Sequence, residues 1–215
     1  ISREKIILNP KLNPNMNFYI IGKNQFEVSP GEYNFAIEFQ EDKSKNTGAY
    51  RQKLKIDSYP IGKFNMSDIV LASSIEPAND SSNYTHKGLK IIPNPAKIFH
   101  KKQLMHIYFE IYNLTINPDQ KTKFKIEYKI STKSKEKKPI ISRIFTSLGK
   151  FIGVKEGKQD ITASYEYEGI TPDESINLSI DMSATTTGIY TLTITTTDLN
   201  SNKSVSKSIK LGIQN

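Results

Sequence analysis

The residues best suited to chemistry in this sequence are three histidines, His86, His100 and His106, which fall close together along the chain. Histidine is a common zinc ligand, and a three-histidine site needs all three rings within about 2.1 Å of one ion. His106 lies in the segment 104–114 on the side opposite its apolar residues, whereas His86 and His100 fall in loops or at strand ends. We interpret all three as surface histidines, and a zinc site is the alternative.

Motifs typical of enzymes are absent from the sequence. It contains no Gly-x-Ser-x-Gly nucleophile elbow, no His-Glu-x-x-His zinc motif and no glycine-rich phosphate loop. It contains no cysteine, which excludes disulfides, thiolate metal sites and cysteine nucleophiles. The carboxylates of Glu41, Asp42 and Asp198 fall at hairpin turns, where polar side chains form turns and caps. The sequence therefore predicts no enzymatic activity, no catalytic or metal-binding residues and no cofactor.

A basic stretch, residues 133–158, departs from the pattern of the rest of the chain. It holds eight basic and two acidic residues, a net charge of +6 beside +8 for the whole chain. Apolar residues between 139 and 152 recur at helical spacing, and Pro139 suits the first turn of a helix. We expect a short amphipathic helix in a strand crossover, packed on the sandwich by its apolar side. Alternatively, the segment binds an anionic envelope or membrane surface through basic residues, namely Lys135, Lys137, Lys138, Arg143 and Lys150.

Alternation of apolar and polar residues dominates the remainder. In 124–130, 176–182 and 190–194 every second residue is apolar, which predicts strands with one face in a core and the other in water. Clusters of Pro, Asn and Asp between such segments indicate turns. The sequence therefore predicts an all-β fold made of immunoglobulin/fibronectin-III-like β-sandwiches.

An internal repeat indicates more than one sandwich. Residues 31–56 align with residues 188–213 without a gap, and seven of the 26 positions are identical. The pattern Gly-x-Tyr begins both copies and resembles a tyrosine corner, in which the tyrosine hydroxyl bonds to nearby backbone. The alternative is chance similarity between two hairpins. The residues to which we assign this structural role are Gly31, Tyr33, Gly188 and Tyr190.

The repeat divides the chain into two domains. Residues 63–215 are long enough for a complete second sandwich, whereas residues 1–62 provide about half of the ~100 residues that one requires. We expect 1–62 to be the C-terminal part of a first sandwich plus a linker, in tandem with the second. Half a sandwich has an open edge and an uncovered apolar face. We therefore expect a protein partner or upstream chain to complete it, and no nucleic acid.

Five short segments carry a family resemblance, namely 30–33, 66–75, 88–95, 108–114 and 188–190. Together they resemble the β-sandwich region of bacterial GWxTD domain-containing proteins, over residues 26–58 and 63–213. The Gly-Trp-x-Thr-Asp motif itself is absent, because the chain has no tryptophan. The resemblance implies a bacterial source and export to the periplasm or cell surface, and it supplies no functional residues.

These observations together predict a non-enzymatic structural or protein-interaction module of an exported bacterial protein. Two alternatives stay open. One is binding to an envelope or membrane surface through 133–158, and the other is an accessory domain of a larger enzyme.

Overall fold

The computed structural model describes residues 21–215 of the chain, apart from 41–43, 80, 135–138, 141–142 and 147–148. The described residues contain strands, turns and loops but no helix, and so no helix among them could span a membrane. The strands are β1 (Gly31–Gln40), β2 (Thr47–Ile56), β3 (Asn65–Met66), β4 (Val70–Pro77), β5 (Thr85–His86), β6 (Leu89–Pro93), β7 (Ile98–His100), β8 (Met105–Tyr112), β9 (Thr122–Ser131), β10 (Arg143–Thr146), β11 (Lys150–Glu156), β12 (Asp160–Gly169), β13 (Glu174–Asp181), β14 (Gly188–Asp198) and β15 (Lys203–Gln214).

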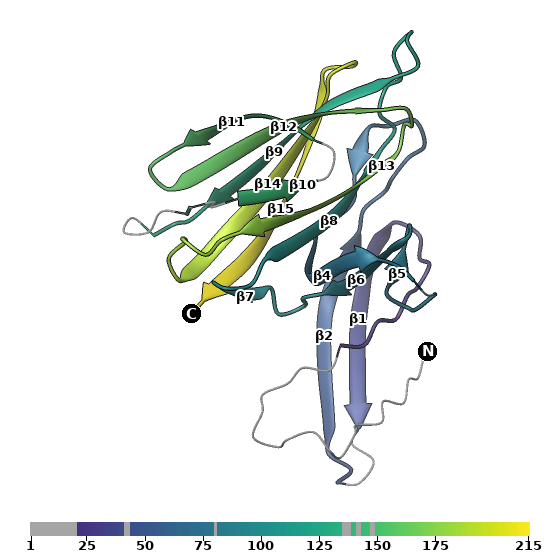
Figure 1. Ribbon diagram of the computed structural model, residues 1–215. Coiled ribbons are helices and arrows are strands. Elements are labelled where there is room, and N and C mark those ends of the chain that lie inside the picture. The colour runs from purple at the N-terminus through teal and green to yellow at the C-terminus, as the bar shows by residue number, and fades with distance from the viewer. Residues whose placement is uncertain (1–20, 41–43, 80, 135–138, 141–142, 147–148) are drawn as a thin grey trace.

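Two large sheets form the body of the molecule (Figure 1). The first, here the β8 sheet, runs in the order β10-β13-β8-β4-β6-β5, with β3 paired to β8. The second, the β14 sheet, runs in the order β11-β12-β9-β14-β15-β7. Neighbouring strands are antiparallel except β15 and β7, which are parallel. A separate two-stranded sheet, β1–β2, projects from this body (Figure 1).

Side-chain alternation places one core between the two large sheets. The inward residues of β8 and β9 are buried, none more than 2% exposed, namely Met105, Ile107, Phe109, Ile111, Phe124, Ile126, Tyr128 and Ile130. All eight belong to a single apolar cluster with residues of β12, β13, β14 and β15. The prediction of an all-β fold is confirmed, and the two layers around one core form a β-sandwich.

The predicted amphipathic helix over 139–152 is wrong. Arg143–Thr146 form β10, which pairs antiparallel with β13. Lys150–Glu156 form β11, which pairs antiparallel with β12. The segment therefore passes from the edge of one sheet to the edge of the other (Figure 1).

Two physical effects outweigh the helical spacing in this segment. Its apolar residues are mainly isoleucine and phenylalanine, which suit the pleated surface of a strand. The edges of both sheets also offer unpaired backbone groups, and pairing with them satisfies the backbone of each short strand. Gly149, between the two strands, lies so close to the Tyr167 ring that an added Cβ would come within 2.6 Å of it. Tertiary contacts, rather than local spacing, thus decide the conformation.

Candidate protein-interaction site

The β1–β2 hairpin and the β14–β15 hairpin have the same strand register. Gly31 pairs with Ile56 in the first, and Gly188 pairs with Ile213 in the second. Every cross-strand pair of β1–β2 recurs between β14 and β15 when 157 is added to both residue numbers. The sequence repeat is therefore also a structural repeat.

Each hairpin begins with the same tyrosine contact. The Tyr33 hydroxyl donates to the Ser29 carbonyl oxygen at 2.7 Å. The Tyr190 hydroxyl donates to the Thr186 carbonyl oxygen, also at 2.7 Å. In both cases the acceptor lies four residues before the tyrosine, so the two corners fix the entering chain in the same way.

The glycine two residues before each tyrosine adopts the same backbone conformation. Gly31 and Gly188 both have φ of 156°. Side chains rarely adopt this conformation, so glycine is favoured at the start of both hairpins. The four residues with a predicted structural role thus occupy matching positions in the two hairpins.

The two hairpins differ in what covers their apolar faces. In β14–β15 this face lies in the sandwich core, where Tyr190 is 1% exposed and Leu211 is 2% exposed. The equivalent residues of β1–β2, Tyr33 and Leu54, are both 37% exposed, and Ile37 on the same face is 49% exposed. A face that is interior in one copy is thus open in the other.

Residues directly opposite each other on paired strands share a face, and faces alternate along each strand. One face of β1–β2 therefore carries apolar and aromatic side chains, including Tyr33, Phe35, Ile37, Tyr50, Leu54 and Ile56. We call these six residues the open face. The opposite face carries mainly charged residues, including Glu32, Glu38, Arg51, Lys53 and Lys55. Arg51 and Glu38 form an ion pair there at 3.1 Å.

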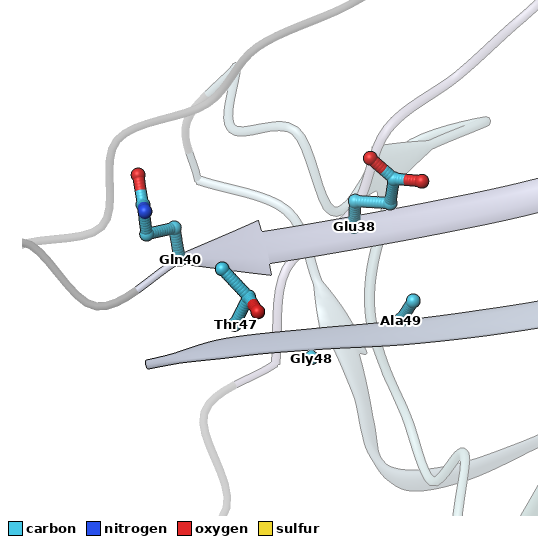
Figure 2. Close-up of a pocket in the computed structure, with 5 residues that line it drawn as sticks. All are labelled: Glu38, Gln40, Thr47, Gly48 and Ala49. Carbon is cyan, nitrogen blue, oxygen red and sulfur yellow. The ribbon is translucent and has the colours of Figure 1, made fainter. Parts of the chain in front are cut away.

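Two hollows lie on this hairpin. One of about 560 Å³ is lined by Glu38, Gln40, Thr47, Gly48 and Ala49 near the far end of the strands (Figure 2). Another of about 330 Å³ is lined by residues around Tyr33 and Leu54. Among the described residues that line the first hollow, the carboxylate is that of Glu38, which accepts a hydrogen bond from Arg51.

Lys207 of β15 ties the base of the hairpin to the sandwich. Its Nζ donates to Asp57 Oδ2 at 2.6 Å and to Asp68 Oδ1 at 2.9 Å. Burial opposes the charge on Lys207, but its hydrogen bonds with the two carboxylates outweigh burial and raise its pKa. Asp57 directly follows β2, and two residues later Tyr59 packs edge-on against Tyr112 at a ring distance of 5.6 Å. The root of the hairpin is therefore held, while the side chains of its open face stay partly or largely exposed.

A cluster around Glu110, which the sequence reading missed, lies on the outer side of the β8 sheet. The Glu110 side chain is 9% exposed. Its Oε1 lies 2.5 Å from His86 Nε2 and accepts a hydrogen bond from the Tyr108 hydroxyl at 2.8 Å. Its Oε2 accepts from Lys87 Nζ at 2.6 Å and from the Tyr112 hydroxyl at 3.2 Å. Four side chains thus surround one carboxylate.

A tight turn brings two of these side chains over Glu110. His86 pairs with Leu89 at the end of the β5–β6 ladder, leaving Lys87 and Gly88 as a two-residue turn. Both turn residues have positive φ, 47° and 77°, as a type I′ hairpin requires. The local sequence signals for this cluster are the Lys-Gly pair and a glutamate between two tyrosines on one strand face.

The pKa values of Glu110 and of the two tyrosines are shifted away from the range that suits acid–base catalysis. Burial opposes ionisation of Glu110, but hydrogen bonds from Lys87, His86 and Tyr108 outweigh it and lower its pKa to about 2. Burial, together with the neighbouring carboxylate, raises the pKa of Tyr108 and that of Tyr112. A general acid or base works best with a pKa near the working pH. We therefore assign the cluster a structural role, holding the β5–β6 hairpin on the sheet.

The three histidines lie in separate environments. His106 Nδ1 lies 2.8 Å from the Ser179 hydroxyl, and burial lowers its pKa. His100 Nδ1 lies 2.8 Å from the Asn215 carbonyl oxygen, and His86 belongs to the Glu110 cluster. Over the part of the chain that is described, no group of three side chains is placed to hold a metal ion.

The predicted basic binding residues are only partly described. Lys135, Lys137 and Lys138 lie outside the described residues. Arg143 is the first residue of β10, and Lys150 is an exposed first residue of β11. These last two belong to different sheets, so the single basic helix face that would have joined them does not form.

Comparison with known proteins adds little to this geometry. No protein-family model matches the chain, and no curated protein matches it. Among solved structures, the chain is similar to an endo-fucoidan hydrolase from glycoside hydrolase family 107, at 11% identity and a TM-score of 0.17. The similarity covers 86% of this chain and 34% of that chain, so it spans about a third of the enzyme. A TM-score this low carries no argument about fold or activity.

Proposed function

We propose that this chain is a non-enzymatic structural or protein-interaction module of an exported bacterial protein, and that β1–β2 is its binding element. One observation carries the proposal. The hairpin repeats the register and the tyrosine corner of β14–β15, yet the apolar face that β14–β15 bury in the core is open. The location in an exported bacterial protein rests on the family resemblance alone.

A partner that covers the open face would stabilise β1–β2. An isolated two-stranded hairpin is at best marginally stable in water. Covering one large apolar side chain contributes roughly 1.5–3 kcal/mol, whereas association costs on the order of 4–15 kcal/mol. Six partly or largely exposed side chains on the open face therefore provide enough surface for a specific contact.

Face-specific photo-cross-linking in the cells that make the protein tests this proposal. A photoreactive amino acid is placed at Ile37, on the open face, or at the neighbouring Ala36, which lies on the opposite face and is also exposed. The two sites are consecutive residues of the same strand, β1. They differ only in which face of the hairpin they report.

We expect intermolecular adducts from position 37, with yields at least ~5-fold above those from position 36, because a partner that buries the open face excludes the other side. Equal yields from both positions, or no adduct from position 37, would contradict the proposed function. The adduct mass also separates a different protein from a second copy of this chain.

A further inference from the structure

We infer that the partner of β1–β2 contributes an amphipathic β-strand from another protein, which pairs antiparallel along the free edge of β1 over residues 34–40 while the rest of that protein covers the open face. The inference deepens the proposed function and rests on it. Its basis is the equivalence of β1–β2 and β14–β15, since the structure shows what lies beside the second hairpin.

The two edges of β14–β15 are paired very differently. The β14 edge pairs antiparallel with β9 along eight residues, from Thr191–Ser131 to Asp198–Phe124. The β15 edge pairs with β7 over only three residues, and in parallel. Subtracting 157 from the β14 positions gives residue 34 as the first paired position of β1. The equivalence therefore selects the β1 edge, rather than the β2 edge, as the principal site for an added strand.

The β1 edge is open for such a strand. In the described residues β1 pairs with β2 alone. An unpaired edge presents a row of N–H and C=O groups that another chain can match, and strand addition is a recurrent mode of peptide recognition. Backbone pairing along β1 would extend the hairpin into a three-stranded sheet. One face of the new strand would then lie next to the open face.

The chemistry of the expected strand follows from β9. Its inward residues Phe124, Ile126, Tyr128 and Ile130 are buried beside the apolar face of β14. Its outward residues are charged, and Glu127 lies opposite Thr195. The equivalent of Thr195 in β1 is Glu38, whose side chain is 69% exposed. Like charges directly opposite each other destabilise a sheet. The partner strand therefore alternates apolar residues with polar ones and carries a basic residue opposite Glu38.

Neither this chain nor a second copy of it can use its own β9 to pair with the β1 edge. β9 lies between β12 and β14, so both of its edges are already paired in every copy. The strand that pairs with β14 is thus not available to β1, and the occupant to which we commit is a strand from a different protein.

A synthetic peptide serves as the probe. It has the ten-residue sequence of β9, Thr122–Ser131, with the change Glu127→Lys to place a lysine opposite Glu38. Backbone amide hydrogen exchange of the 215-residue chain is measured with and without the peptide. A scrambled peptide of the same composition, which lacks alternation, is the matched control. A peptide that retains Glu127 tests the charge pairing.

We expect the alternating peptide to slow amide exchange in residues 34–40 by at least ~10-fold and to leave β2 unchanged, because the added ladder protects only the outward groups of β1. The Glu127 peptide should bind ~2–5-fold more weakly. In the variant Glu38→Lys this preference should reverse, so that the Glu127 peptide becomes the tighter ligand.

Protection that falls on β2 instead, equal effects of scrambled and alternating peptides, absence of protection, or a preference that Glu38→Lys does not reverse would each overturn the inference. So would a dimer of this chain in sedimentation whose amides in 34–40 are already protected without the peptide. If the position 37 cross-link to another protein forms while the peptide fails, the proposed function stands and only strand addition is refuted.

Discussion

Tyr33 and Tyr190 make the same hydrogen bond, from the hydroxyl to the carbonyl oxygen four residues earlier, but only Tyr190 is buried. Tyr190 is 1% exposed and Tyr33 is 37% exposed. Because backbone register and corner geometry are shared, the difference arises from the sheet that covers β14–β15 and has no counterpart over β1–β2 among the described residues. The local structure of the hairpin therefore does not depend on its cover.

Removing each tyrosine hydroxyl should have unequal effects on stability. Tyr190→Phe should lower the free energy of unfolding of the sandwich by about 0.5–1.5 kcal/mol, because a buried hydrogen bond is lost. Tyr33→Phe should change it by less than about 0.5 kcal/mol, as expected for an exposed site. Urea unfolding of both variants is the measurement. Equal losses would show that the β1–β2 corner is as firmly packed as the corner in the core.

The Glu110 cluster should contribute to stability. Glu110→Gln should destabilise the protein by roughly 1–3 kcal/mol, because Lys87 and His86 lose a charged acceptor in a largely buried position. The exposed Glu166→Gln on β12 is the matched control and should cost less than about 0.5 kcal/mol. Thermal unfolding at neutral pH compares the two. Equal losses of stability in Glu110→Gln and Glu166→Gln would contradict the structural role assigned to Glu110.

The pH dependence of stability provides a second test of this cluster. The pKa of Glu110 in the folded protein is about 2, below its ordinary value of 4.5, so the unfolded chain binds the proton more tightly. The contribution of Glu110 is thus complete above pH 4.5 and is lost as the pH falls towards 2. The difference in unfolding free energy between wild type and Glu110→Gln should shrink over this interval. A difference that stays constant would contradict the lowered pKa.

The conformation of the segment after β10 can be tested at Gly149. In a helix, Gly149→Ala would stabilise by about 1 kcal/mol. In the structure, the added Cβ meets the buried Tyr167 ring within 2.6 Å, so we expect a loss of about 1–3 kcal/mol instead. Gly153→Ala has nothing within 4 Å of its added Cβ and should have little effect. A gain in stability for Gly149→Ala in urea unfolding would contradict the close contact with Tyr167 and would support a helix in this segment.

Alternation and repetition were the parts of this fold that the sequence could predict. A period of two determines which residues of β9 face the core, and slipping the register by one would turn Phe124 outward and Lys125 inward. The gapless match of Gly31 and Tyr33 with their second copies likewise predicted a second hairpin, because register depends on nearby residues. Such local patterns do not depend on contacts with distant parts of the chain.

Features that depend on distant contacts could not be predicted. Ile144 and Phe151 fit a helical stripe by spacing, but β13 and β12 lie where they can pair with the backbone of these residues. Glu110 looked like one carboxylate among many, because His86 and Lys87 approach it only through the β5–β6 turn. The repeat predicts that Tyr33 is buried like Tyr190, and this is wrong, because the cover of Tyr190 comes from strands outside the hairpin.

Amide hydrogen exchange of the purified 215-residue chain tests whether β1–β2 is the same unit as β14–β15 without its cover. Equivalent residues of the two hairpins share the same register, so each amide in 31–40 has a partner for comparison in 188–197. We predict exchange in β1–β2 to be at least ~100-fold faster, because local opening costs little where no core must be exposed. Equal protection of the two hairpins in the purified monomer would contradict the claim, since it would mean that the open face is already covered.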